Sequence, residues 1–299
     1  MSVTLESTYL NEPGMEWLTG NLHAHTTESD GSRAPQEVVD DYASRGYAFL
    51  MISDHDKLTD PAPLKSHGMV LIPGNEVSAK GPHLLHIGAQ ARLNPNPDRQ
   101  QVLDAIKEEG GIAVLNHPNW QEHFNHCPQE RLDGWNHYAG IEIYNGVIRR
   151  LAGSPLATDR WDRLLGAGRV MWGFANDDSH RPEDVQLAWN VVQAAARTPE
   201  AIMEALRKGR FYGSTGVELS ALAVHGRTIH LAAPNAERIC VVADYGKRIA
   251  QIDRCECTYH VPDDLPFRYV RLECYGRGEA MAWTQPIFIK TEKKEDEKK

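Results

Sequence analysis

Histidines and carboxylates follow short apolar segments in the stretch from residue 20 to residue 56. His23 and His25 stand two residues apart behind the apolar Leu22. In an extended strand both rings point to the same side, because successive side chains alternate between the two faces. Asp30 closes the loop that follows. The pattern predicts a strand whose end carries several groups able to act together.

A helix and a second strand follow directly. Residues 35–45 begin with a proline and end before Gly46, which is typical of a helix. The apolar run 47–52 is short and bounded, as expected for a buried strand, and it leads to His55 between two aspartates. The order strand, loop, helix, strand, loop is how an α/β barrel collects functional side chains at one mouth.

The same bias continues along the chain as far as residue 180. We predict strands at 68–72, 83–89, 112–115, 141–144 and 170–174, and helices at 98–109, 155–166 and 199–208. Nearly every predicted strand in this region ends in His, Asp, Glu or Asn. Core packing does not explain the bias, because polar groups at strand ends lose hydration unless they find partners.

The remainder of the chain has a different pattern. From residue 217 to residue 289 short alternating segments are separated by turn residues, and helical periodicity is lost. We therefore predict an α/β chain in three parts. These are a barrel domain over 1–212, a small all-β, sandwich-like domain over 213–290, and a disordered charged tail over 291–299.

Composition argues against several classes of protein. The net charge of −9 argues against broad electrostatic binding of nucleic acid. We expect neither a membrane span nor an export signal, because the apolar runs are short and the first residues lack a basic and then apolar region. Five cysteines without a Cys-x-x-Cys pair favour reduced thiols and a cytoplasmic location.

Taken together, the polar strand ends predict a metal site. A lone histidine is usually a packed or surface residue, but here His-x-His, Asp-His-Asp, Glu, His-Pro and Asp-x-His groups all follow strands of one array. The donors are nitrogen and carboxylate oxygen without thiolate, which suits Zn, Mn or Fe. Such ions attract an anion and activate water for attack on it.

In type and order, these groups resemble the motifs of the PHP superfamily, named for polymerase and histidinol phosphatase, over about residues 20–210. The resemblance implies a distorted seven-stranded (β/α) PHP barrel that holds two or three divalent metal ions (Zn, Mn or Fe). It also implies that Glu76 bridges two of them. The metal ligands carried over are His23, His25, Asp30, His55, Glu76, His86, His117, Asp178 and His180.

One ligand position stays open between His83 and His86. Residues three apart in a strand face opposite ways, so only one of these rings is expected to point inward. We favour His86, which apolar residues flank inside the strand, and assign His83 to substrate binding. In the last motif, the Asp-x-His spacing selects Asp178 over Asp177.

Attack of an activated water on an anion also needs protein groups that hold or move protons near the ions. We therefore assign catalytic roles to Glu76, His180 and Asp54. Asp54 and Asp56 are expected to orient His55 or a water from behind the ligands. A general acid is sought in the neighbourhood of His180 or among the histidines of the insert 119–139.

Substrate contacts are predicted from position alone. We assign Arg33, Arg181, His83 and Asn145 to substrate binding. Either arginine suits a phosphate, although solvation at the surface explains both equally well. The insert 119–139, which contains Trp120 and His126, is either a lid that sets substrate choice or a long surface connection.

The leading hypothesis is a metal-dependent phosphoesterase that hydrolyses a phosphate mono- or diester of a small anionic molecule. Nucleic acid is not an expected partner except as a small nucleotide, and the oligomeric state stays open. The alternative is hydrolysis of a non-phosphate ester or carbamate, because residues 213–216 and 282–287 resemble a PHP branch with a C-terminal β domain that includes carbaryl hydrolases. A non-enzymatic binding module is disfavoured, because every ligand position is filled.

Overall fold

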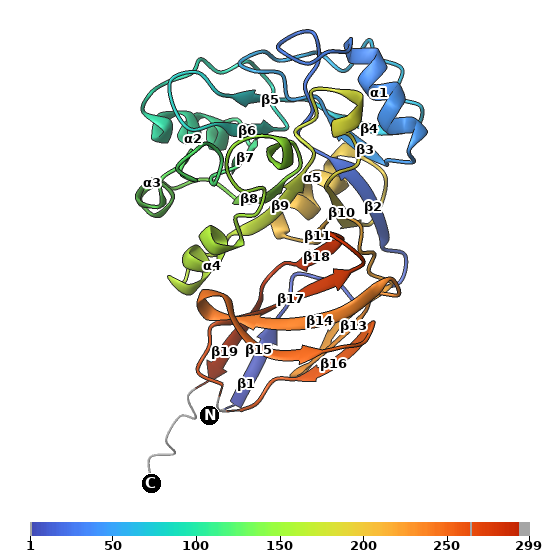
Figure 1. The fold of residues 1–299 in the computed structure, drawn as a ribbon, viewed down its shortest axis with the longest axis vertical. Coiled ribbons are helices and arrows are strands. Elements are labelled where there is room, and N and C mark those ends of the chain that lie inside the picture. The colour runs from blue at the N-terminus through green and yellow to red at the C-terminus, as the bar shows by residue number, and fades with distance from the viewer. Residues whose placement is uncertain (1, 264, 293–299) are drawn as a thin grey trace.

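The computed structural model describes residues 2–263 and 265–292. Within these residues the strands form three sheets of eleven, five and three strands. In Figure 1 the upper part of the molecule carries the helices, and the lower part consists of strands with both chain termini at its lower end. Over these same residues, each helix is too short or too polar to span a bilayer.

The upper part is built from two groups of strands. One group is the end of the eleven-stranded sheet. Its members, in spatial order, are β10 (Trp189–Ala194), β2 (Glu16–Asn21), β3 (Phe49–Met51) and β4 (Val70–Ile72). The other group is the five-stranded sheet of β5 (Gly74–Val77), β6 (Leu84–Ile87), β7 (Ile112–Leu115), β8 (Gly140–Asn145) and β9 (Trp172–Asn176). Strands β2, β3 and β4 run parallel, as do β7, β8 and β9.

The two groups meet at two places without joining into one ladder. Between β4 and β5 stands Pro73, which has no N–H to donate. Between β9 and β10 the side chain of Asn190 replaces a ladder. Its Oδ1 accepts from Ala175 N at 3.1 Å, and its Nδ2 donates to Ala175 O at 2.8 Å. The described residues therefore form open sheets, and the predicted closed seven-stranded barrel is not confirmed.

All four helices predicted from the sequence are confirmed, with small shifts at their ends. They are α1 (Pro35–Ser44), α2 (Arg99–Glu108), α4 (Thr158–Gly166) and α5 (Pro199–Lys208). The hydroxyl of Thr198 accepts from Ala201 N at the start of α5, and Gly209 ends the helix with a φ of 70°. Strands β5 and β10 and the short α3 (Gln129–Gly134) had not been predicted, because none of them shows a clear period.

The lower part is all-β, and its two sheets share one apolar core. One sheet contains β12 (Ala221–His225), β13 (Thr228–Ala232) and β16 (Glu256–His260). The other contains β14 (Ala236–Ala243), β15 (Lys247–Ile252) and β17 (Tyr269–Gly276). Leu231 and Cys257 of the first sheet belong to the same buried cluster as Val241 and Leu272 of the second. Two sheets thus pack on one core, but the second is not confined to residues 213–290, because it continues through β18 and β11 into the upper part.

Strand pairing crosses the predicted domain boundary. Residues 212 and 213 both lie in β11 (Phe211–Ser214), which pairs with β10 on one side and β18 (Met281–Thr284) on the other. Strand β1 (Ser2–Glu6), which we had assigned to the barrel, pairs with β19 (Ile287–Glu292). Residues 291 and 292 of the predicted tail lie in β19, and the rest of that tail lies outside the described residues.

A buried ion cluster joins the upper and lower parts. Arg271 on β17 donates from Nε to Asp162 Oδ1 at 3.0 Å and from Nη2 to Asp162 Oδ2 at 2.8 Å. Its Nη1 donates to Glu273 Oε1 at 2.7 Å, and the Tyr269 hydroxyl donates to Asp162 at 2.9 Å. The guanidinium also lies 5.0 Å from the centre of the Trp161 ring. Helix α4, which carries Asp162 and Trp161, is thereby attached to β17.

Candidate metal centre

Glu76, at the third position of β5, is surrounded by histidine rings. Its Oε2 lies 2.8 Å from His55 Nδ1. Its Oε1 lies 3.2 Å from His83 Nδ1, 3.3 Å from His117 Nε2 and 3.4 Å from His23 Nε2. The side chain is 1% exposed. A fifth ring, that of His25, has its Nε2 at 3.7 Å from Oε2, so one buried carboxylate faces five rings.

Asp178 forms the second carboxylate of the cluster. Its Oδ1 lies 3.1 Å from His25 Nε2 and 3.2 Å from His23 Nε2. The residue follows β9 and has a φ of 56°, and His117 has a φ of 27°. Positive φ is costly for residues other than glycine, and such strain is found mainly at functional sites. The backbone after β7 and β9 is thus held in an unfavourable form that places both side chains in the cluster.

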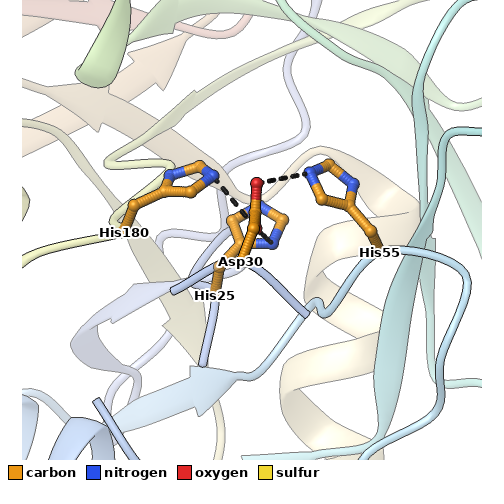
Figure 2. Close-up of side chains that lie close together, drawn as sticks. All are labelled: His25, Asp30, His55 and His180. Atoms are coloured by element: carbon orange, nitrogen blue, oxygen red, sulfur yellow. Dashed lines mark ion pairs between the residues drawn. The ribbon is translucent and has the colours of Figure 1, made fainter. Parts of the chain in front are cut away.

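The third carboxylate, Asp30, closes the cluster on its solvent side. Figure 2 shows it between the rings of His55 and His180, with His25 behind it. Asp30 oxygens lie 3.4 Å from His180 Nε2, 3.5 Å from His55 Nε2 and 3.7 Å from His25 Nδ1. His180 Nδ1 donates to Asp178 O at 2.8 Å, which leaves Nε2 as the ring nitrogen that faces Asp30.

The cluster leaves several buried polar atoms unpaired. His23 Nε2, His25 Nε2, His83 Nδ1, Glu76 Oε2 and Asp178 Oδ1 have no hydrogen-bond partner among the described residues. A buried polar atom without a partner costs free energy, and an ion is one of the few explanations for a group of them. These atoms belong to sets of three or four side chains whose donor atoms converge. The residues present therefore fit divalent ions held by nitrogen and oxygen.

The electrostatics of the cluster also favour cations. Burial alone would raise the pKa of Glu76, but the rings of His83 and His23 hold it well below its usual value. Burial alone would lower the pKa of His55, whereas its contacts with Asp30 and Glu76 raise it to about 10. The three carboxylates thus attract positive charge, and metal ions would displace protons from the rings.

Glu142, on β8, holds the ligands from behind and was missed in the sequence. Its Oε1 accepts from His23 Nδ1 at 2.7 Å and from Asn176 Nδ2 at 2.9 Å. Its Oε2 accepts from His117 N at 2.9 Å and from Asn145 Nδ2 at 2.9 Å. The carboxylate fixes the His23 tautomer and turns its Nε2 toward the cluster. The only signal in the sequence was a glutamate inside the apolar segment 141–144.

His83, and not His86, lies with the other rings. The side chain of His86 is fully buried on the opposite face of β6, where its Nε2 is 3.5 Å from Glu109 Oε2. There it packs on Gly111, and burial lowers its pKa to about 4. We had preferred His86 as the ligand, and the positions of the two rings correct this assignment to His83. The two rings do face opposite ways, but apolar flanks marked the core residue rather than the ligand.

This pair of histidines is directly testable. We expect His83→Ala to lower the metal content and His86→Leu to keep it, because only His83 reaches the carboxylates. The loss of metal affinity should be about 10-fold or more, since even outer partners of a metal site contribute that much. Elemental analysis after dialysis against a fixed metal buffer measures both variants. The reverse ranking would restore His86 as the ligand.

Asp54 does not reach the cluster. Its Oδ1 accepts from Thr26 N at 2.7 Å and Ser29 Oγ at 2.8 Å, and its Oδ2 accepts from Thr26 Oγ1 at 2.8 Å and Thr59 Oγ1 at 2.6 Å. With both oxygens used in this way, it anchors the loop that carries Asp30. The catalytic role predicted for Asp54 is therefore not supported by its position. Asp56 is similarly used, because it accepts from Ser78 and Ala79.

Of three predicted substrate contacts, Arg33 and Asn145 lie elsewhere than expected, whereas Arg181 lies beside the cluster. Arg33 Nη1 donates to Asp41 at 2.6 Å, away from the cluster. Arg181 is exposed in a surface hollow that also borders Asp30. Asn145 is buried and donates from Nδ2 to Glu142 at 2.9 Å and to Asp178 at 3.1 Å. Its position indicates a residue that orients Asp178 rather than one that contacts substrate.

The insert 119–139 lies beside the cluster. Trp120 lines the pocket in front of it, and its indole is 5.0 Å from the His117 ring and 5.6 Å from the His83 ring. His126 Nε2 accepts from the backbone N of His83 at 3.0 Å. The pocket has a volume of ≈ 190 Å³ and is open to solvent. The other residues that line it are Asp30, His55, Glu76, His83, His117, Val147, Ile148, Leu151, Asp178 and His180.

Comparison with known proteins finds one family model and two curated relatives that match parts of this chain. Residues 171–211 match a family model described as PHP-associated. A 3',5'-nucleoside bisphosphate phosphatase from Chromobacterium violaceum is 39% identical over 148 residues, which cover 43% of this chain and 50% of that protein. An uncharacterized protein from Methanocaldococcus jannaschii is 26% identical over 98 residues, or 33% of this chain and 38% of that one. The chain thus spans half or less of the curated relatives it matches.

One solved structure covers nearly the whole chain. It is a protein from Bacteroides vulgatus, described as a two-domain protein containing a predicted PHP-like metal-dependent phosphoesterase. The TM-score is 0.56 at 17% identity, and the match covers 96% of this chain and 98% of the other. At this identity the likeness concerns the fold alone: a mixed α/β unit with many strands, joined to a second unit.

Proposed function

We propose that this chain is a metal-dependent phosphoesterase that hydrolyses a phosphate mono- or diester of a small molecule. The observation that carries the proposal is the cluster of six histidines and three carboxylates whose donor atoms converge at one pocket. The names of the Chromobacterium relative and the Bacteroides structure support it. The ligands we propose are His23, His25, Asp30, His55, Glu76, His83, His117, Asp178 and His180.

The charge of the centre suits an anionic substrate. Two divalent ions bring a charge of +4 against the −3 of Asp30, Glu76 and Asp178, which leaves +1. Bound divalent ions would polarise the phosphoryl group and activate water. Among the protein groups, Glu76 lies between two sets of rings. It is the residue that we would expect to contact more than one ion. His180 lies at the solvent side and lines the pocket, and we propose that it meets the reacting group.

The surrounding residues hold the ligands in place and form part of the pocket wall. Glu142 fixes His23, and Asn116 Nδ2 donates to Glu76 Oε1 at 2.6 Å. Such outer partners set the direction of each ligand atom before substrate arrives. Trp120 and Ile148 form apolar walls of the pocket, so on these sides the polar ligands border a space of low polarity. Charge interactions are stronger in such a space than in bulk water.

Metal removal and restoration test the proposal. We expect protein treated with a strong chelator to lose phosphoester hydrolysis, and Zn, Mn or Fe to restore it. The assay should use a panel of phosphomonoesters and phosphodiesters, with bound metal counted by elemental analysis. Faster metal-dependent hydrolysis of a neutral aryl ester or carbamate would favour the alternative hydrolase. Full phosphoesterase activity in protein free of metal would refute the proposal.

A further inference from the structure

A second pocket opens beside the metal centre. Its volume is ≈ 450 Å³, and Ile148 and Leu151 line both this pocket and the one in front of the ligands. Tyr144, Leu156 and Met281 complete most of its wall. The two spaces therefore lie side by side with a shared wall, and the second is bounded mainly by apolar side chains. We call it the side pocket.

The wall of the side pocket is fixed by backbone hydrogen bonds. Two hydrogen bonds attach the segment 151–156 to the insert 119–139. Gln121 N donates to Ala152 O at 2.9 Å, and Ser154 N donates to Asn119 O at 3.0 Å. At Gly153 the approach is so close that a Cβ would stand 2.6 Å from Asn119 O. The side pocket is thus preformed, as small-molecule sites usually are.

The rim of the side pocket exposes an apolar side chain. Leu151 is 41% exposed and is one of four large apolar residues with such exposure among the described residues. An apolar side chain between a polar centre and a preformed hollow gains free energy when a ligand covers it. The only charged groups on this wall, Arg149 and Glu279, pair with each other across the outer edge. They leave the interior without a charge for a polar ligand to meet.

We propose that the side pocket binds the organic group of the substrate, and that this group is aromatic or otherwise bulky and apolar. The inference rests on the proposed function, since it places the phosphate at the metal centre. The lower part of the molecule then takes a share in substrate choice, because Met281 on β18 belongs to the same wall as Leu151. The substrate class is a phosphate ester of an apolar alcohol.

Two matched substrates separate this proposal from simple phosphatase activity. 2-Phenylethyl phosphate and 2-hydroxyethyl phosphate are both esters of primary alcohols. The first carries a phenyl ring where the second carries a hydroxyl group. With the metal-loaded protein, we expect kcat/KM to be about tenfold higher for the phenyl compound, a difference of about 1.4 kcal/mol. Equal values for the two substrates would contradict the proposal.

Variants locate the preference. Leu151→Asp should reduce the ratio of the two kcat/KM values about tenfold, through KM for the phenyl substrate, and Met281→Ala should reduce it severalfold. Val170→Asp is the matched control, because Val170 is also an exposed apolar residue but lines neither pocket. The Leu151 side chain is exposed, so the variant should fold, as circular dichroism would verify. An unchanged ratio in Leu151→Asp would overturn the assignment.

A binding measurement distinguishes failure of this inference from failure of the proposed function. Equilibrium dialysis with 2-naphthol, which has no phosphate, should show binding to the metal-loaded protein and weaker binding to Leu151→Asp. If no phosphate ester is hydrolysed but this difference is found, the proposed function fails and the side pocket stands. If phosphate esters are hydrolysed without preference and 2-naphthol does not bind, the side pocket proposal fails alone.

Discussion

Glu76→Gln should keep the fold of this protein and lower the proposed phosphoester hydrolysis by more than about 100-fold. Loss of an outer partner of a metal site costs up to about 100-fold, and Glu76 is proposed as a direct ligand. Glu76 contacts rings through both of its oxygens, His55 at Oε2 and His117 at Oε1. An amide of the same shape removes the negative charge that divalent ions need. The bound metal, counted by elemental analysis, should fall together with kcat.

Two other glutamates provide a graded comparison. Glu142→Gln should cost about 10–100-fold, because Glu142 orients His23 without facing the pocket. Glu109→Gln should leave activity and metal content unchanged, since Glu109 approaches only His86 behind β6. Full activity with normal metal content in Glu76→Gln would remove the basis of the proposed centre. An equal loss in all three variants would indicate a general effect on folding instead.

Arg271→Met should produce the largest loss of stability, about 3–5 kcal/mol of unfolding free energy. The substitution leaves Asp162 and Glu273 buried without their cation, and the desolvation cost of both carboxylates is then uncompensated. Thermal unfolding followed by circular dichroism should show a drop in Tm on the order of 10 °C. A drop of only 1 or 2 °C would mean that the cluster does not hold the two parts together.

An exposed pair serves as the control. Arg149→Met removes the partner of Glu279, and this pair also connects the upper part to the lower part. Both side chains are in contact with water, so the change in unfolding free energy should stay within about 1 kcal/mol. If the two arginine variants lose equal stability, burial is not the reason for the effect.

The buried cluster also predicts a dependence on pH. Burial alone would raise the pKa of Glu273, but Arg271 holds it below its usual value. A carboxylate with a lowered folded-state pKa stabilises the fold above its unfolded pKa, and this stabilisation is lost as pH falls through the folded-state value. The Tm of the unaltered protein should therefore decrease on acidification more than the Tm of Arg271→Met.

The sequence was most informative where chemistry and periodicity agree. Polar residues after apolar runs located His23, Asp30, Glu76 and Asp178, and the structure brings these side chains together. The helices were also predictable, because α2 and α5 have apolar periods with clear ends. These signals are local, since a strand end and a helix cap are each written in a few neighbouring residues.

The errors concern contacts between distant parts of the chain. Asp54 and Asn145 look like site residues by their positions in the sequence. In the structure Asp54 Oδ1 accepts a hydrogen bond from Thr26 N, and Asn145 Nδ2 donates one to Glu142. The structural role of such a residue depends on a partner that sequence spacing does not reveal. The pairing of β1 with β19 is an equally distant contact. Because of it, the first strand lies in the lower part and not in the predicted barrel.

The contacts between β9 and the β2–β10 side of the fold have a consequence for how the centre meets its ions. Asp178 follows β9, and His23 follows β2, which pairs with β10. Beyond the two bonds of Asn190 with Ala175, His25 N donates to Ser179 O at 2.8 Å and Ser179 N donates to His23 O at 3.3 Å. These backbone bonds set the spacing of ligands from the two groups of strands before any ion arrives.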